Sequence, residues 1–155
     1  GLELELMYQV TEAWDLMVTY GYLEAEYKDY LADLTGDGVI TDNSGLIPRN
    51  TPENTFGITT SYTTQVGDGE LKGRISYRFR DEMNSDSSNN PYGDLDSIEN
   101  LNATINYSID NYSITIWGRN LTDEREQRWA TIGGLTSRGW WNEPQTLGIT
   151  FSASY

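Results

Sequence analysis

Strict alternation of apolar and polar residues is the feature that most constrains the fold of this chain. The opening segment, GLELELMYQV, sets Leu2, Leu4 and Leu6 on one side and glutamates on the other. Because successive side chains of a β-strand point to opposite faces, such a segment forms a strand with one apolar and one polar face. The same period returns in WDLMVTYGY, TFGITTSYT, LKGRISYRFR, NLNATINYS, YSITIWGRN and QTLGITFSASY. The sequence therefore predicts an all-β chain of seven strands.

The connections between these segments alternate in length. Short turns (TEA, QVGDGE and IDN) alternate with long segments at about 28–55, 81–99 and 122–144. Transmembrane barrels have short periplasmic turns and long extracellular loops, whereas a soluble sandwich has no reason to sort its connections by length. The pattern favours an antiparallel, up-and-down transmembrane β-barrel, in which one face of each strand meets lipid and the other a polar lumen.

Composition excludes several classes of function. The net charge of −14 argues against a nucleic-acid partner, because phosphates require a basic surface. The chain has no cysteine and no histidine, which removes disulfide frameworks, the common nucleophile–base pairs and most zinc sites. We therefore expect neither an enzyme nor a tightly held cofactor.

Basic residues of the predicted strands lie on the polar side of the alternation. A charged side chain that faced lipid at mid-membrane would cost about 2–4 kcal/mol, so these residues are expected to face the lumen or whatever fills it. They are Lys72, Arg74, Arg78, Arg80 and Arg119.

One stretch of the first long connection, DLTGDGVITDNS, has the spacing of a calcium loop. Oxygen ligands and a turning glycine stand where such a loop needs them, but Ser44 replaces the bidentate glutamate at its twelfth position. Tyr27, Tyr30, Leu31 and Leu34 recur with helical spacing, which indicates a short helical turn leading in. We expect no ion here, or else a weak, loop-ordering calcium. The candidate ligands are Asp33, Thr35, Asp37, Val39 and Asp42.

Aromatic and basic residues gather in the third long connection, around TSRGWWNEP. Indole rings beside guanidinium groups suit stacking on a ligand at the extracellular side, and their alternative role is to anchor the loop at the membrane surface. The candidate ligand contacts are Arg128, Trp129, Arg138, Trp140 and Trp141.

Three segments together resemble one family. GLIPRNTPENTFGITTSY, IWGRNLTDEREQ and NEPQTLGITFSASY are similar, in this order, to the loop return, penultimate strand and closing strand of TonB-dependent outer-membrane receptors. The resemblance implies that residues 1–155 are the last seven strands of a barrel of about 22 strands, without the upstream strands, the plug domain and the TonB-contacting segment. It also implies that Phe151 and Tyr155 belong to a C-terminal assembly signal.

The same resemblance implies a function. Such a receptor lies in the outer membrane of a Gram-negative bacterium, contacts lipid, its own plug domain and the TonB complex, and takes up a scarce small-molecule ligand such as a ferric siderophore, cobalamin or carbohydrate. Two alternatives stay open from the residues alone. One is a passive outer-membrane porin, and the other is a soluble, calcium-dependent, carbohydrate-binding β-sandwich.

Overall fold

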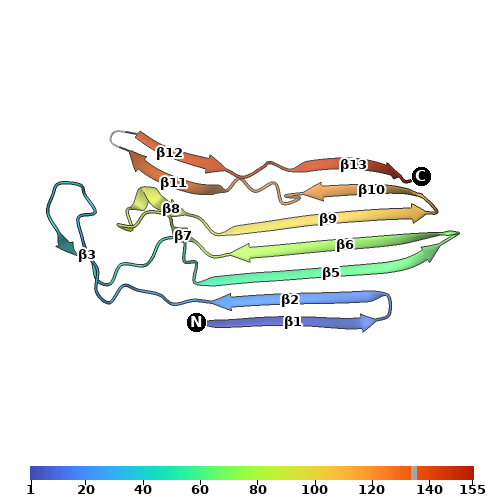
Figure 1. The fold of residues 1–155 in the computed structure, drawn as a ribbon, viewed down its shortest axis with the longest axis horizontal. Helices are drawn as coiled ribbons and strands as arrows, with labels where there is room; N and C mark the ends of the chain where they lie inside the picture. The colour runs from blue at the N-terminus through green and yellow to red at the C-terminus, as the bar shows by residue number, and fades with distance from the viewer. Residues whose placement is uncertain (134–135) are drawn as a thin grey trace.

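The computed structural model describes residues 1–133 and 136–155, and side chains outside 128–137. Seven long strands lie side by side in one antiparallel sheet (Figure 1). In sheet order they are β1 (Leu2–Thr11), β2 (Trp14–Tyr22), β5 (Asn54–Val66), β6 (Gly69–Arg80), β9 (Ile98–Ile109), β10 (Tyr112–Arg119) and β13 (Thr146–Ala153). Each long strand pairs with the next one along the chain, which confirms the predicted up-and-down arrangement. The strands form one sheet rather than two stacked sheets, so the β-sandwich alternative is wrong.

Three further pairs of strands lie within the long connections. The first connection, residues 23–53, contains the pair β3 (Leu31–Ala32) and β4 (Thr41–Asp42). The second, residues 81–97, contains β7 (Met83–Asn84), the 3-10 helix η1 (Pro91–Gly93) and β8 (Asp94–Leu95). The third, residues 120–145, contains β11 (Gln127–Gly133) and β12 (Thr136–Trp141). The sequence did not predict these pairs.

The register brings the apolar side of every strand to one face of the sheet. Leu6 pairs with Val18, which pairs with Ile58, and the row continues through Tyr77 to Leu101. A second row crosses the other half of the sheet through Gly73, Ile105, Ile116 and Ile149. The predicted faces are confirmed, apart from a bulge in β1 between Gln9 and Thr11 that ends the alternation there.

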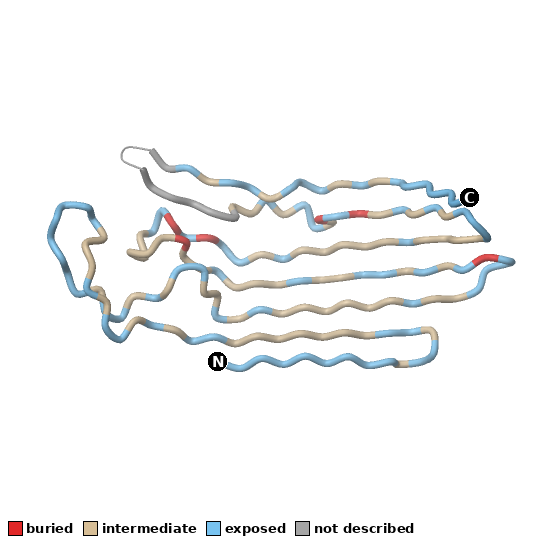
Figure 2. The backbone as a smooth tube through the Cα atoms, viewed as in Figure 1, coloured by how far each residue is buried: buried red, intermediate tan, exposed pale blue. Residues whose placement is uncertain are grey.

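The sheet has no packed interior behind this apolar face. Among the described residues, Leu95 is the one large apolar side chain that is buried, and it belongs to β8 in the second long connection. The long strands are almost entirely intermediate or exposed along their length (Figure 2). In the strands, apolar side chains such as Ile116 and Ile149 are 54% and 70% exposed. Burial of these faces must therefore come from something other than this chain. In the described part, no helix has the length and apolarity needed to cross a membrane.

The two ends of the sheet differ. All three long connections leave the end at which the chain begins, and the short turns and the C-terminus lie at the other (Figure 1). One short turn, between β5 and β6, has two central residues, with Gly67 first at a φ of 62°. A positive φ at that position suits a type II′ turn, whose twist matches that of the two strands. The predicted sorting of connections by length is confirmed.

Candidate functional site on the polar face

A row of basic side chains runs along β6 on the polar face. Arg78 pairs across the sheet with Gly57 on one side and Asn100 on the other, and Arg74 pairs with Ser61 and Thr104. Lys72 lies next in the row, beside neutral Thr63 and Asn106. All these direct cross-strand neighbours are uncharged, so none of them forms an ion pair with the row. We call Lys72, Arg74, Arg78 and Arg80 the basic row.

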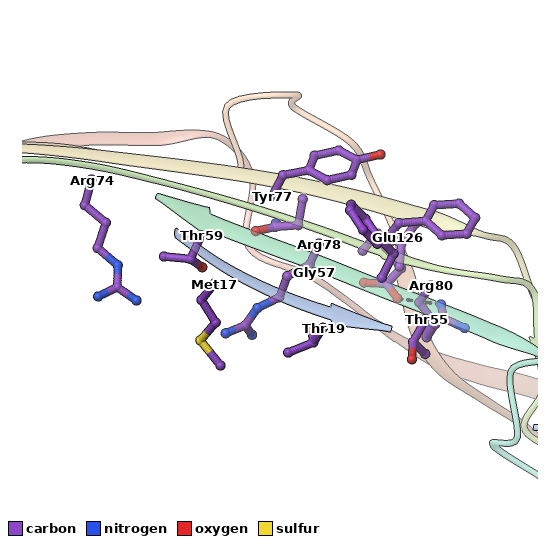
Figure 3. A pocket seen from close by; sticks show the side chains of 14 residues that line it. Met17, Thr19, Thr55, Gly57, Thr59, Arg74, Tyr77, Arg78, Arg80 and Glu126 are labelled. Atoms are coloured by element: carbon purple, nitrogen blue, oxygen red, sulfur yellow. Dashed lines mark hydrogen bonds and ion pairs between the residues drawn. The ribbon is translucent and has the colours of Figure 1, made fainter. Parts of the chain in front are cut away.

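Small residues of β2 and β5 leave space beside Arg78, toward the end of the row that is nearer the long connections. Glycine and threonine alternate there, so that the Thr19 hydroxyl lies over Gly57 and the Thr55 hydroxyl lies over Gly21. A Cβ at Gly57 would lie 2.6 Å from the Thr19 Oγ1. The polar face is hollowed at this place, and Arg74 and Arg78 point to the same side of the sheet as Thr19, opposite to Tyr77 (Figure 3).

Arg80 is the last residue of the row and of β6, where the second long connection begins. Its Nη2 lies 2.8 Å from Glu126 Oε1 and donates to the Asp96 carbonyl at 3.1 Å, and its Nη1 donates to the Asp81 carbonyl at 3.0 Å. The exposed fractions of the Arg80 and Glu126 side chains are 17% and 11%. This ion pair joins the sheet to the third long connection (Figure 3).

Arg119, also predicted to face the lumen, lies apart from the basic row. Its guanidinium carbon is 5.2 Å from the centre of the Trp117 ring, a cation–π arrangement. The Trp117 ring lies over Gly148, and its Nε1 donates to Thr150 Oγ1 at 3.1 Å. All five predicted basic residues are thus on the polar face, but only the four on β6 form one row.

The Asn89 side chain and a backbone hydrogen bond join the first and second long connections. Asn89 accepts a hydrogen bond from the Ile47 N–H and donates one to the Ile47 carbonyl, both at 2.8 Å. The Asn50 N–H also donates to the Asn84 carbonyl at 2.8 Å. The two connections therefore hold each other at the end of the sheet where the basic row ends with Arg80.

Removal of the Asn89 side chain should loosen this junction. Asn89→Gly tolerates the φ of 52° but loses both hydrogen bonds, so we expect a local weakening of about 1–2 kcal/mol and faster exchange of the Ile47 amide hydrogen. Hydrogen–deuterium exchange of the intact protein measures it. Asn50→Gly is the matched control, since Asn50 has a φ of 59° and its contact to Asn84 is made by the backbone. Equal exchange at Ile47 in both variants would contradict the role of Asn89.

The calcium-like stretch of the first connection is closed by its own hydrogen bonds. Asp33 accepts from the Gly38 and Gly36 N–H groups at 2.7 Å each, Asp37 accepts from Val39 N–H, and Asp42 accepts from Ser44. The hydrogen bond from Gly38 is the largest cause that lowers the pKa of Asp33, and the Ser44 hydroxyl lowers the pKa of Asp42. These bonds are complete at neutral pH and are lost as the pH falls through the lowered pKa values.

The expected helical lead-in to this stretch is wrong. Leu31 and Ala32 pair with Asp42 and Thr41 as strands, because the cross-strand pairing outweighs the helical spacing of the aromatic residues. Within the described residues, no three acidic side chains gather closely enough to hold a metal ion. Thr35 lies inside the hairpin with its hydroxyl 3.3 Å from Asp33. Calcium binding at Asp33, Thr35, Asp37, Val39 and Asp42 stays a prediction.

The predicted ligand contacts of the third connection lie on a hairpin rather than on an irregular loop. Trp140 and Trp141 belong to β12 and are 74% and 64% exposed, and Arg138 is exposed on the same strand. Arg128 and Trp129 belong to β11, but their side chains lie outside the described part of the chain. The hairpin places these residues beyond the end of the sheet (Figure 1). Their role in ligand binding stays a prediction.

The two residues of the predicted assembly signal differ in position. Phe151 lies on the apolar face of β13, with its ring stacked on that of Tyr112 at 6.2 Å. Tyr155 lies beyond the end of β13 at Ala153, so the alternation expected to include it stops two residues earlier. Its role in assembly is untested.

Sequence reasoning missed the residues that organise the outer end of the polar face. Asn120 is 3% exposed, and its amide group donates to the carbonyls of Glu124 and Glu143. Glu126 was one of several acidic loop residues with no distinguishing neighbour in the sequence. The contacts of Asn89 and Glu126 span 42 and 46 residues, so no local pattern indicates them.

The sheet of this chain is similar to part of a known family of β-barrels. The family described as "TonB dependent receptor-like, beta-barrel" matches residues 1–121. A similar solved structure is the ferric yersiniabactin uptake receptor FyuA from Yersinia pestis, with a TM-score of 0.82 and 16% sequence identity. The alignment covers 99% of this chain and 23% of that chain, so this chain spans about a quarter of the length of the receptor. At this identity the match shows the fold, which is part of a β-barrel. Because the family match extends over most of the chain, the protein belongs to the TonB-dependent receptor-like β-barrel family.

Proposed function

We propose that this chain forms part of the barrel wall and outer loops of an outer-membrane receptor that takes up a scarce ligand with energy delivered through TonB. The observation that carries the proposal is the sheet with one apolar face, one polar face that carries the basic row, and all three long connections at one end. A wall strand of a transmembrane barrel needs these features, because its outer face meets lipid and its inner face meets the lumen. The family is one of receptors rather than enzymes.

The orientation follows from the lengths of the connections. Long loops of such barrels are extracellular and short turns periplasmic, so residues 23–53, 81–97 and 120–145 lie outside the cell. The apolar face then contacts lipid of the outer membrane of a Gram-negative bacterium. The basic row faces the lumen, where it meets the plug domain or the ligand. In this proposal the plug and the TonB-contacting segment are parts of the protein outside this chain, and residues 1–155 are the C-terminal portion of its barrel.

Ferric siderophores, cobalamin and carbohydrates fit a receptor of this kind, and the similarity in fold to an uptake receptor for ferric yersiniabactin puts ferric chelates first. Arg138, Trp140 and Trp141, at the outer end, are proposed to contact the ligand together with Arg128 and Trp129. No cofactor is proposed, apart from the untested weak calcium of the first connection.

Energised uptake tests the function. Cells that produce the intact protein should accumulate one of three labelled probes, a ferric siderophore, cyanocobalamin or a maltodextrin, more than cells without it. Accumulation should cease when a protonophore collapses the proton-motive force or when TonB is deleted. Uptake of all three probes that persists without energy would instead identify a passive porin and overturn the proposal.

A further inference from the structure

The basic row is the one strongly charged surface of the described residues that opposes the charge of the whole chain. The protein carries a net charge of −14, yet four cations follow one strand on the polar face. Side chains two residues apart on a strand lie about 7 Å from each other, so Arg78 and Arg80 raise the local positive potential together. Such a surface attracts anions, and the hollow of small residues beside it leaves room for one (Figure 3).

Most of the row has no anionic partner. In the part of the chain that the structure describes, no carboxylate lies within 4 Å of Lys72, Arg74 or Arg78, and Arg74 and Arg78 are exposed. The groups that flank Arg78 across the sheet are Gly57 and Asn100, and neither neutralises a guanidinium. Arg78 therefore presents guanidinium donors that no carboxylate of the described residues occupies, next to Arg80 in the row.

The Arg80–Glu126 ion pair shows that this end of the row already binds one carboxylate. Two backbone carbonyls, from Asp81 and Asp96, fix the Arg80 guanidinium without cancelling its charge. The carboxylate of Glu126 completes the set through a single oxygen at 2.8 Å. A contact through one oxygen is weaker than a bidentate pair, so an incoming carboxylate or phosphate that engages two guanidinium groups can compete with it.

The backbone of Glu126 is held by the third connection, whereas its carboxylate contacts Arg80 of the sheet. Its N–H donates to Asn142 Oδ1 at 3.0 Å, and Asn142 donates in turn to the Glu124 carbonyl at 2.9 Å. A ligand that displaces the Glu126 carboxylate from Arg80 therefore removes one of the contacts that tie this connection, with its β11–β12 hairpin, to β6.

We propose that Arg78 and Arg80 form a binding site for an oxyanion-bearing ligand, a carboxylate or a phosphate, and that Glu126 is an internal competitor that occupies Arg80 until the ligand arrives. The inference rests on the proposed function only in placing the polar face inside a barrel. It adds a charge class for the ligand and a consequence of binding, which is the loss of the Glu126 tie between β6 and the third connection, while residues 120–124 stay hydrogen-bonded to β9.

Binding of small anions by the intact protein in detergent tests the site, with citrate and inorganic phosphate as probes at constant ionic strength. Glu126→Gln removes the competing charge and should bind both probes roughly fivefold more tightly than the native protein by calorimetric titration. Arg78→Gln should bind them about tenfold more weakly. Saturating citrate should speed hydrogen–deuterium exchange of the Glu126 amide in the native protein, leave the Leu121 amide, which donates to the Leu101 carbonyl, unchanged, and leave both unchanged in Glu126→Gln.

Two matched controls keep the result specific. Glu124→Gln changes an acid of the same connection that contacts the Glu99 N–H and not the basic row, and Arg119→Gln changes a basic residue of the same face outside the row. Both should bind the probes as the native protein does. Folded native and Glu126→Gln proteins that bind neither probe, or an unchanged affinity in Glu126→Gln, would overturn the inference. Probe binding that emerges only after deletion of the plug would also overturn it, because a plug carboxylate would then fill the site.

Ligand uptake and probe binding can fail independently. Loss of energised uptake with probe binding intact would count against the proposed function alone. Energised uptake in a protein that binds no anion at this row would count against the oxyanion site alone.

Discussion

Val18→Arg should destabilise the intact protein in lipid vesicles by about 2–4 kcal/mol. Val18 lies at the middle of β2 on the apolar face, paired with Leu6 and Ile58, where a guanidinium would have to enter the hydrocarbon region. Equilibrium unfolding in denaturant, followed by the loss of β-structure, measures the change in free energy of unfolding.

Met17→Arg is the control for this substitution. Met17 is the preceding residue of the same strand, so its side chain points to the polar face, where it lies between Met7 and Thr59. An arginine there can reach water, and we expect a change of less than about 1 kcal/mol. If the two variants lost equal stability, the assignment of the apolar face to lipid would be wrong.

Gly69→Ala should destabilise the protein by about 1–3 kcal/mol, because it overpacks the first residue of β6. A Cβ at Gly69 would lie 2.5 Å from the Tyr107 hydroxyl oxygen and 2.6 Å from the Ser108 carbonyl oxygen. The backbone carbonyl cannot move without disturbing the β6–β9 pairing, and the Tyr107 hydroxyl donates to the Val66 carbonyl at 3.0 Å. The same unfolding measurement reports the loss.

Gly73→Ala makes the same change four residues along the strand and on the same face. Nothing lies within 4 Å of the position of its Cβ, so we expect no loss, or a gain of up to about 1 kcal/mol from the smaller entropy of the unfolded chain. A loss in Gly73→Ala as large as that in Gly69→Ala would mean that glycine is needed along β6 for a reason other than space.

The strands and their faces were predictable because a β-strand has a side-chain period of two. A shift of one residue would turn the whole apolar set of a strand to the polar face, so the alternation fixes which side of each strand faces out. Thus the positions of Arg74 and Arg78 on the polar face could be predicted before the register was known. Which residues stand opposite them, such as Gly57 and Asn100, could not, because the β5–β6 register depends on the exact turn and the β6–β9 pairing spans a long connection.

The outer end of the molecule was far less predictable. Asn89 and Glu126 act through partners more than 40 residues away, and neither stands in a periodic pattern. The sequence predicts a loop at 122–144, where the structure has the β11–β12 hairpin, because glycines and tryptophans break the alternation there. The calcium-like spacing of the first connection was visible in the sequence, but spacing alone does not show that the Asp33 carboxylate is already engaged by Gly36 and Gly38.

The absence of a packed interior behind the sheet affects which amino-acid substitutions the apolar face tolerates during evolution. A side chain such as Ile149 or Phe151, about 70% exposed on the apolar face, has few protein neighbours whose shape it must match. In the bilayer that we propose, its neighbours are mobile acyl chains that adjust to any apolar outline, so exchanges among leucine, isoleucine, valine and phenylalanine carry little of the packing cost found in a close-packed core. Selection then acts on the polarity of these positions and hardly on their identity.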